Sequence, residues 1–202
     1  MRHPYLQDPM SSEVDPMQIT IAVFDRFAQK YKEVLEVKEL DWELISAAVK
    51  TLNELSKHPE TADEMIDKEI LPVVSELLTS ESAEVREQSA RLLGTFALSA
   101  IGRQMFEYAF DSLKNLLEDP ELAVREASAW TMKRLSVNDD GCQRMIEMKA
   151  PVSMINSFIK HSSEEELKKE DSKYLVYLLE AFVNLTFSDI GIQPLLGCNA
   201  IE

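Results

Sequence analysis

Glycine and cysteine are scarce in this 202-residue sequence, which holds five glycines and two cysteines. Phosphate-binding loops and dinucleotide-binding folds need glycine where the backbone turns with positive φ or approaches a ligand closely, so the composition disfavours both. Neither Cys142 nor Cys198 lies in a CxxC or Cys/His cluster, and a chain of this length can bury a core without a disulfide. We therefore expect two reduced thiols in or near helix packing, and a reducing compartment.

Positive charge is scarce too, since the sequence has 21 Lys and Arg but 36 Asp and Glu, which gives a formal net charge of −15. Nucleic-acid binding gains energy by neutralising phosphates with Lys and Arg, and no run of basic residues supplies a local patch. The same charge sign argues against anionic lipid surfaces. No apolar run approaches the roughly 20 residues of a bilayer crossing, and the start, Met1-Arg2-His3-Pro4, lacks the apolar region of a secretory signal. We expect neither nucleic-acid nor membrane partners.

Side-chain groupings typical of catalysis or metal binding are missing from the pattern. His3, His58 and His161 lie far apart, in a predicted arm or at predicted turns, without partners at metal-ligand spacing. No carboxylate pair stands out as a general acid and base, and Cys142 has no recognisable nucleophile context. We predict a protein that is not an enzyme and uses no cofactor, metal or small-molecule substrate.

The sequence does contain internal repeats. Residues 85–90 (Val-Arg-Glu-Gln-Ser-Ala) recur 39 residues later as 124–129 (Val-Arg-Glu-Ala-Ser-Ala). Apolar side chains follow at i, i+3 and i+6, which is one face of a helix. A period near forty with helical content is typical of HEAT and armadillo arrays. The four stripes are Val49, Leu52 and Leu55; Ala90, Leu93 and Phe96; Ala129, Met132 and Leu135; and Leu179, Phe182 and Leu185.

These repeats predict an all-α fold, a right-handed armadillo/HEAT-like superhelical solenoid of about four repeats with a leading N-terminal helix. Each unit reads as a long stripe helix, a short helix and a third helix that opens near a proline, as at Pro72 and Pro151. Methionines such as Met132, Met145 and Met154 are expected to fill the core. The expected segments are an extended arm at 1–16, the leading helix at 17–37, and units at 39–80, 81–119, 120–162 and 163–202, the last incomplete. The helices expected in the third unit are 121–136, 142–149 and 151–160.

Two features of the last unit stand out. The polar run 163–171 interrupts the period, and it is either a solvated loop or an acidic docking element. The last stripe helix should expose an apolar edge, because solenoids normally end in a polar cap. We expect either a continuing chain or a partner to cover that edge. The apolar residues expected to form this edge are Leu175, Leu178, Leu179, Phe182 and Leu185.

Residues 129–136 (Ala-Trp-Thr-Met-Lys-Arg-Leu-Ser) resemble the armadillo third-helix consensus Ala-Trp-x-Leu-x-Asn-Leu-Ser, and Asp140-Gly141 continue it. The resemblance is to the catenin and importin-alpha superfamily, and it implies protein binding on the surface of successive third helices. Importin alpha clamps an extended basic peptide with repeated Trp and Asn, of which only Trp130 and Asn184 remain, so this mode is not supported. The mixed charge suits a folded partner instead. The candidate protein-binding residues are Lys50, Arg91, Trp130 and Glu180 in the Trp row, and Glu54, Thr95, Arg134 and Asn184 in the Asn row.

Trp130 has two readings, as an interface anchor or as a packing residue. Nearly the whole chain also resembles the armadillo-repeat radial spoke proteins of motile cilia (the radial spoke head protein 14 homologs). That resemblance rests on the order and spacing of short matches such as Gly102-Arg103, Asp119-Pro120 and the acidic run 164–166. It implies a non-catalytic scaffold of the axonemal radial spoke, with other spoke subunits as partners, in the cytoskeleton of the cilium or flagellum.

Members of that family carry further repeats, whereas this sequence ends at Glu202. The alternative function is a general cytosolic armadillo adaptor that binds an extended peptide in its concave groove.

Overall fold

The computed structural model describes residues 28–36, 42–162 and 173–188, and all its regular structure within these ranges is helical. Residues 28–36 form a helix that lies inside the leading helix predicted at 17–37. The helices that follow are α2 (Trp42–Leu55), α3 (Pro59–Asp67), α4 (Ile70–Leu77), α5 (Ala83–Phe96), α6 (Ala100–Gln104), the 3-10 helix η1 (Phe106–Tyr108), α7 (Phe110–Leu116), α8 (Leu122–Leu135), α9 (Asp139–Glu147), α10 (Ala150–His161) and α12 (Lys173–Phe187).

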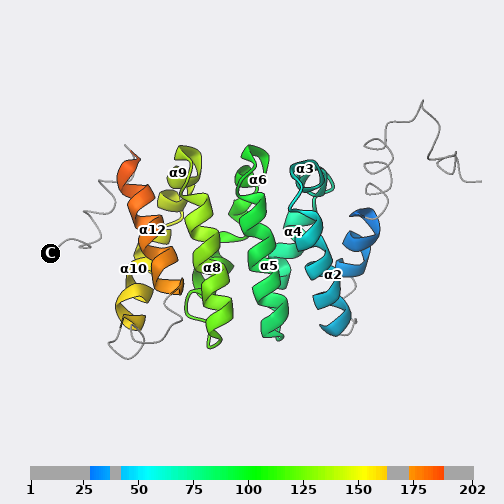
Figure 1. The fold of residues 1–202 in the computed structure, drawn as a ribbon, viewed down its shortest axis with the longest axis horizontal. Coiled ribbons are helices and arrows are strands. Elements are labelled where there is room, and N and C mark those ends of the chain that lie inside the picture. Colours follow the sequence, from blue (N-terminus) through cyan, green and yellow to red (C-terminus); the bar gives the residue numbers. More distant parts are fainter. Residues whose placement is uncertain (1–27, 37–41, 163–172, 189–202) are drawn as a thin grey trace, which may run out of the picture.

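The stripe helices α2, α5, α8 and α12 lie side by side in one row (Figure 1), and each contacts the next. Behind this row lie α4 and α10, while α3, α6 and α9 cross at one end (Figure 1). The three helices predicted in the third unit are confirmed as α8, α9 and α10, with ends that differ by one to three residues. The all-α solenoid predicted from the repeats is thereby confirmed.

The stripe residues form the core between neighbouring helices. All six stripe positions of α5 and α8 are fully buried, as are Met145 of α9 and Met154 of α10. Because α5 lies between α2 and α8, and α8 lies between α5 and α12, no unit could bury this surface alone. The repeated apolar residues are therefore the ones through which neighbouring units contact each other.

The two repeated glycines stand where the short helix crosses the end of the stripe helix. A Cβ atom at Gly102 would lie 2.2 Å from the carbonyl oxygen of Phe96, and one at Gly141 would lie 1.9 Å from that of Leu135. Only glycine permits so close an approach of two backbones. The 39-residue recurrence of glycine is therefore a steric requirement of the turn.

The third helices open as predicted, with Pro72 and Pro151 in their first turns, where a missing amide hydrogen costs no hydrogen bond. The residues before these helices, Glu69 and Lys149, both have φ of 56°. The second unit departs from the predicted plan, because its short helix is divided into α6 and η1.

The last stripe helix, α12, exposes an apolar edge as expected, because no helix of the described part packs beyond it. Of the five residues expected in this edge, Leu179 is 47% exposed and Phe182 is half-buried. The placement of Leu175, Leu178 and Leu185 in the edge was wrong, because these three side chains are buried. Val176, Val183 and Phe187 form the edge together with Leu179.

Several expectations fall on residues that the structure does not describe. These are the arm at 1–16, residues 17–27 and 37 of the leading helix, the acidic run 163–171, His3 and Cys198. The unit boundaries stay a prediction. Cys142 is a free, buried thiol whose Sγ donates to the carbonyl oxygen of Ser136 at 3.1 Å. Among the described residues, no helix is both long and apolar enough to cross a bilayer.

Candidate protein-binding groove

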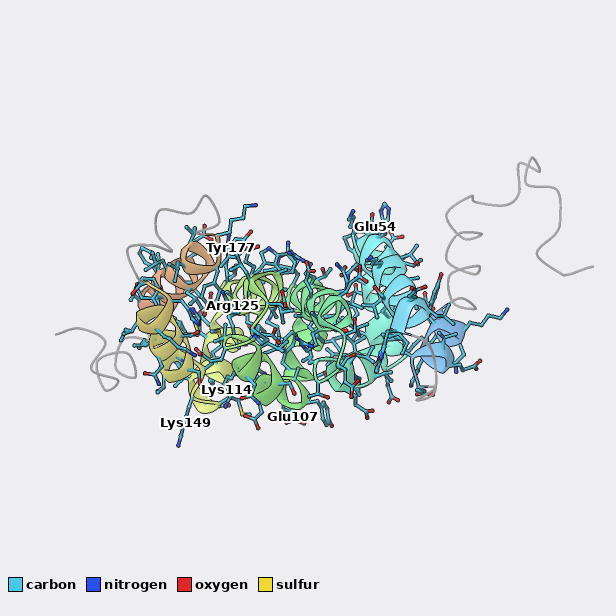
Figure 2. All side chains as sticks on the ribbon, turned by 90° about the horizontal axis from the view of Figure 1, so that it is seen from below. Glu54, Glu107, Lys114, Arg125, Lys149 and Tyr177 are labelled. Carbon is cyan, nitrogen blue, oxygen red and sulfur yellow. The ribbon has the colours of Figure 1, made fainter. Side chains whose placement is uncertain are left out.

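A groove of about 750 Å³ opens where the carboxyl-terminal halves of α2, α5 and α8 lie side by side. Figure 2 shows Glu54 on the side of the molecule that carries the stripe-helix row, while Glu107, Lys114 and Lys149 lie on the opposite side. The groove thus crosses three consecutive units. Its lining residues are Asn53, Glu54, Ser56, Lys57, Pro59, Ala62, Asp63, Gln88, Arg91, Thr95, Leu98, Ser99, Trp130 and Arg134.

The groove is shaped by a close contact between Trp130 of α8 and Gly94 of α5. A Cβ atom at position 94 would lie 2.3 Å from Cζ3 and 2.6 Å from Cε3 of the indole. The Trp130 ring therefore lies directly against the backbone of α5, and it is only partly buried. Trp130 therefore packs between two units, and its role as an interface anchor stays a prediction.

Arg134 lies one helical turn beyond Trp130 and stacks on its ring, with Cζ 4.2 Å from the ring centroid. Its Nη1 lies 3.5 Å from the carbonyl oxygen of Gly94, at the outer limit of a hydrogen bond. Burial lowers the pKa of Arg134 from its ordinary value. No carboxylate in the described ranges pairs with this guanidinium.

The other two cations of the groove have carboxylate partners within the chain. Lys57 Nζ lies 2.5 Å from Glu54, and Arg91 Nε lies 2.9 Å from Glu87. With Arg134 these make three cations, and the carboxylates of Glu54, Glu87 and Asp63 balance them. The groove and the carboxylates paired with it therefore carry no net charge, on a chain whose net charge is −15.

The structure gathers five of the eight candidate residues in the groove, namely Glu54, Arg91, Thr95, Trp130 and Arg134. The remaining three are outside its lining and engage the chain itself. Lys50 pairs with Glu84, Glu180 lies 2.7 Å from Lys133, and the amide nitrogen of Asn184 donates to Ser136 Oγ at 3.0 Å. A binding role for these eight residues stays a prediction.

The eight residues of the Trp row and the Asn row did not predict the whole lining of the groove. The Asn53 side chain donates to the backbone carbonyl of Gln88 at 2.8 Å and joins α2 to α5. Leu98 and Ser99 come from the turn after α5. Helical geometry could have predicted Asn53, because the residue one before an Asn-row position also lies near the next helix.

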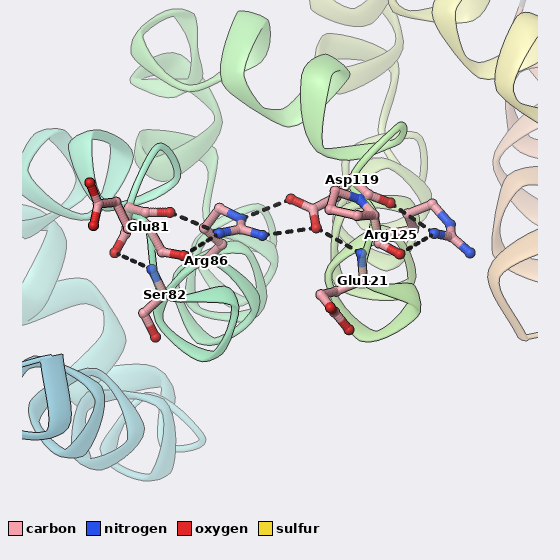
Figure 3. Close-up of polar contacts among 8 residues, drawn as sticks. Glu81, Ser82, Arg86, Asp119, Glu121 and Arg125 are labelled. Atoms are coloured by element: carbon pink, nitrogen blue, oxygen red, sulfur yellow. Dashed lines mark hydrogen bonds and ion pairs between the residues drawn. The ribbon is translucent and has the colours of Figure 1, made fainter.

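Two partly buried arginines link neighbouring units at the amino-terminal ends of α5 and α8 (Figure 3). Arg86 of α5 donates to both carboxylate oxygens of Asp119, and to the carbonyl oxygens of Ser80 and Glu81. Arg125, 39 residues later, makes the matching carbonyl contacts, to Asp119 and Pro120. The recurring Val-Arg-Glu motif therefore ties α5 and α8 each to the turn before it.

Arg103 of α6 adds a link to the next short helix, because its Nε lies 2.7 Å from the Asp140 carboxylate of α9. Burial opposes ionisation of Asp140, but the hydrogen bond from Arg103 outweighs it together with smaller favourable contributions, and the pKa of Asp140 is lowered. Within the described residues, no group of three His, Cys, Asp or Glu side chains is arranged to hold a metal ion. The polar contacts described above join units and shape a surface.

Comparisons with known proteins agree with this geometry. The HEAT repeat family matches residues 70–100, which contain α4 and α5. A designed armadillo repeat protein in complex with the peptide (KR)4 is similar in structure, with a TM-score of 0.72 and 19% identity, over 97% of this chain and 85% of that one. A computationally designed armadillo repeat protein for modular peptide recognition gives 0.71 and 18%, over 92% and 82%.

An engineered protein gives a TM-score of 0.72 and 22% identity, over 86% of this chain and 69% of that one. A comparison with curated protein sequences gave no match. At these identities the likeness concerns the fold. The chain has the fold of an armadillo/HEAT-type solenoid.

Proposed function

We propose that this protein is a non-catalytic scaffold that holds partner proteins, and that the groove across α2, α5 and α8 receives a partner. The observation that carries the proposal is the groove itself, which joins an aromatic ring, a stacked guanidinium and amide side chains from three units. Trp and Arg are the residues most enriched at the energetic centres of protein interfaces. A solenoid presents such a surface without any need for turnover or a cofactor.

Photo-crosslinking tests the scaffold proposal. Benzoylphenylalanine at Leu98, which lines the groove and is 54% exposed, should capture the same partner protein in repeated experiments. The matched control is Tyr108 of η1, which is 62% exposed and does not line the groove. Equal capture at the two positions, or none at Leu98, would refute a binding role for the groove.

Within the class of scaffolds, we propose a structural subunit of the axonemal radial spoke that contributes to the regulation of ciliary and flagellar motility. Its support is the sequence resemblance carried by the order of short matches such as Gly102-Arg103 and Asp119-Pro120. Its partners would be other spoke subunits, bound through permanent interfaces of order 2,000 Å² or more in total.

Imaging of the tagged protein in ciliated cells tests this placement, and cross-linking mass spectrometry of isolated axonemes identifies the neighbours. Staining along the axoneme and cross-links to spoke subunits are the expected results. Uniform cytoplasmic staining of cells without cilia would count against it.

The groove also favours a second candidate, a general cytosolic adaptor that binds an extended peptide. Two of the similar structures are described as bound to a peptide or made for peptide recognition, and this chain has a groove on its stripe-helix row. Binding of short synthetic peptides with micromolar affinity separates the two, because a subunit that packs on folded neighbours should bind isolated peptides weakly.

A further inference from the structure

We infer that the groove binds a carboxylate-bearing segment of its partner, and that this carboxylate pairs with the guanidinium of Arg134. The inference rests on the proposed protein-binding role of the groove and adds the chemistry of the bound segment. It holds for a segment of a folded partner and for an extended peptide.

The state of Arg134 is the first observation. Lys57 and Arg91, the other cations of the groove, already lie beside Glu54 and Glu87. Arg134 is partly buried and, among the described residues, has no carboxylate partner. A partly desolvated guanidinium has lost some of its water, so a carboxylate from a partner gains more here than at a fully exposed arginine.

The geometry of Arg134 is the second observation. Its Cζ lies over the Trp130 ring at 4.2 Å from the centroid, and of its nitrogens Nη1 alone has a partner among the described residues, the Gly94 carbonyl oxygen at 3.5 Å. The N–H groups lie in the plane of the guanidinium, and a carboxylate accepts two of them side by side. Trp130 is itself held by the backbone of Gly94, so the guanidinium is oriented before the partner arrives.

The charge around Arg134 selects among anions. Lys57 pairs with Glu54 and Arg91 pairs with Glu87, which leaves Arg134 and the carboxylate of Asp63 as the remaining charges of the lining. A single carboxylate matches the one charge of Arg134, whereas a phosphate, with a charge near −2, would leave uncompensated negative charge beside Glu54 and Asp63. A strongly basic segment of the (KR)4 kind would meet Arg91 and Arg134 directly.

The experiment begins with a random peptide library displayed on phage and selected on the full-length protein. Enriched peptides are synthesised with free and with amidated carboxyl termini. They are then measured on the wild type, on Trp130→Ala, on Arg134→Gln and on Lys149→Gln. Lys149 is the matched control, because the change removes one positive charge from the opposite side of the molecule (Figure 2).

The expected result is peptides with Asp or Glu whose dissociation constant rises at least about tenfold on Arg134→Gln and less than about twofold on Lys149→Gln. Replacing the critical Glu of the peptide by Gln should weaken binding to the wild type but add nothing on Arg134→Gln. Binding that survives amidation assigns a side-chain carboxylate, and binding lost on amidation assigns the chain end; either supports the pairing.

Two other outcomes overturn the inference, and they are distinguishable. Peptides that lose affinity on Trp130→Ala but are basic or neutral, or are weakened equally by the two charge variants, refute the carboxylate while leaving the groove as a binding site. A selection without any peptide that depends on Trp130 overturns the groove itself.

Discussion

Arg86 and Asp119 form a two-point ion pair, with Nε donating to Oδ2 at 2.8 Å and Nη2 donating to Oδ1 at 2.9 Å. Both side chains are largely buried, and Asp119 also accepts the backbone N–H of Glu121 at the start of α8. The pair therefore holds α5 and the start of α8 in one geometry.

Removal of this carboxylate should be costly. Asp119→Ala leaves the Arg86 guanidinium buried without its counter-charge, and we expect a loss of about 3 kcal/mol in the free energy of unfolding, measured by urea titration. The neighbouring Glu118→Ala is the control, because Glu118 pairs with Lys160 at the surface and its removal should cost less than about 1 kcal/mol. Equal losses for the two variants would contradict the bridging role of Asp119.

Gly94→Ala should destabilise the protein although alanine favours helix by about 1 kcal/mol. The added methyl group would overlap the indole of Trp130, so we expect a net loss of about 1–3 kcal/mol and a change in Trp130 fluorescence, read in a Trp42→Phe background. In a Trp130→Ala background the loss should be smaller, and the part that remains is expected from Thr131, whose Oγ1 would lie 2.7 Å from the added methyl carbon. A loss of the same size in both backgrounds would show that the indole is not the cause.

Lys149→Gly should stabilise the protein by about 0.5–1 kcal/mol, because Lys149 is exposed and has φ of 56°, a conformation that costs an L residue free energy and glycine almost none. Lys149→Ala keeps the strained conformation and separates it from the loss of the lysine side chain. Thermal unfolding measures both variants, and similar melting temperatures would argue that the backbone is not strained here.

The Cys142 thiol should react slowly in the folded protein. Burial raises its pKa above the usual 9.0, so the thiolate is disfavoured, and the sulfur is enclosed. In a Cys198→Ser variant, alkylation by iodoacetamide at pH 8 should be at least about a hundredfold slower than in urea. Comparable rates would show that the thiol is accessible.

The same pKa shift predicts a pH dependence. Because the folded pKa lies above the unfolded one, the contribution of Cys142 to stability is present below pH 9.0 and is lost as the pH rises through the folded pKa. A Cys142→Ala variant should lack this loss in urea titrations above pH 9.0. Parallel pH profiles for the two proteins would assign the alkaline loss to other groups.

The helices could be predicted from the sequence because the repeat pattern reports the surface that each unit buries against the next. Ala90, Leu93 and Phe96 recur as Ala129, Met132 and Leu135, since both helices lie between neighbours. Leu175, Leu178 and Leu185 were wrongly placed in the exposed edge of the last helix, because this helix is apolar on more than one side and its sequence does not show which side is covered.

The lining of the groove could be predicted only in part, because each charged side chain can reach several carboxylates or rings and the sequence does not show which of them it contacts. The Trp row holds Lys50 and Arg91, and the Asn row holds Arg134, all on the same side of their helices. Nothing in the spacing of these three residues shows which of them pairs with a carboxylate of the chain. In the structure the first two pair with Glu84 and Glu87, whereas the Cζ of Arg134 lies over the Trp130 ring. The Trp130 ring can lie beneath Arg134 only because residue 94 is a glycine, and the sequence around Gly94 does not indicate that an indole packs against it.

The proposed use of the stripe-helix face for partner binding is tested most directly by mapping a bound peptide with NMR. Peptides are selected on the whole protein without bias toward any site, and amide and indole shifts are followed during titration. We predict that changes centre on the carboxyl-terminal halves of α2, α5 and α8 and include the Trp130 indole N–H. Changes centred instead on α7 and α10, with the Trp130 indole unaffected, would contradict it.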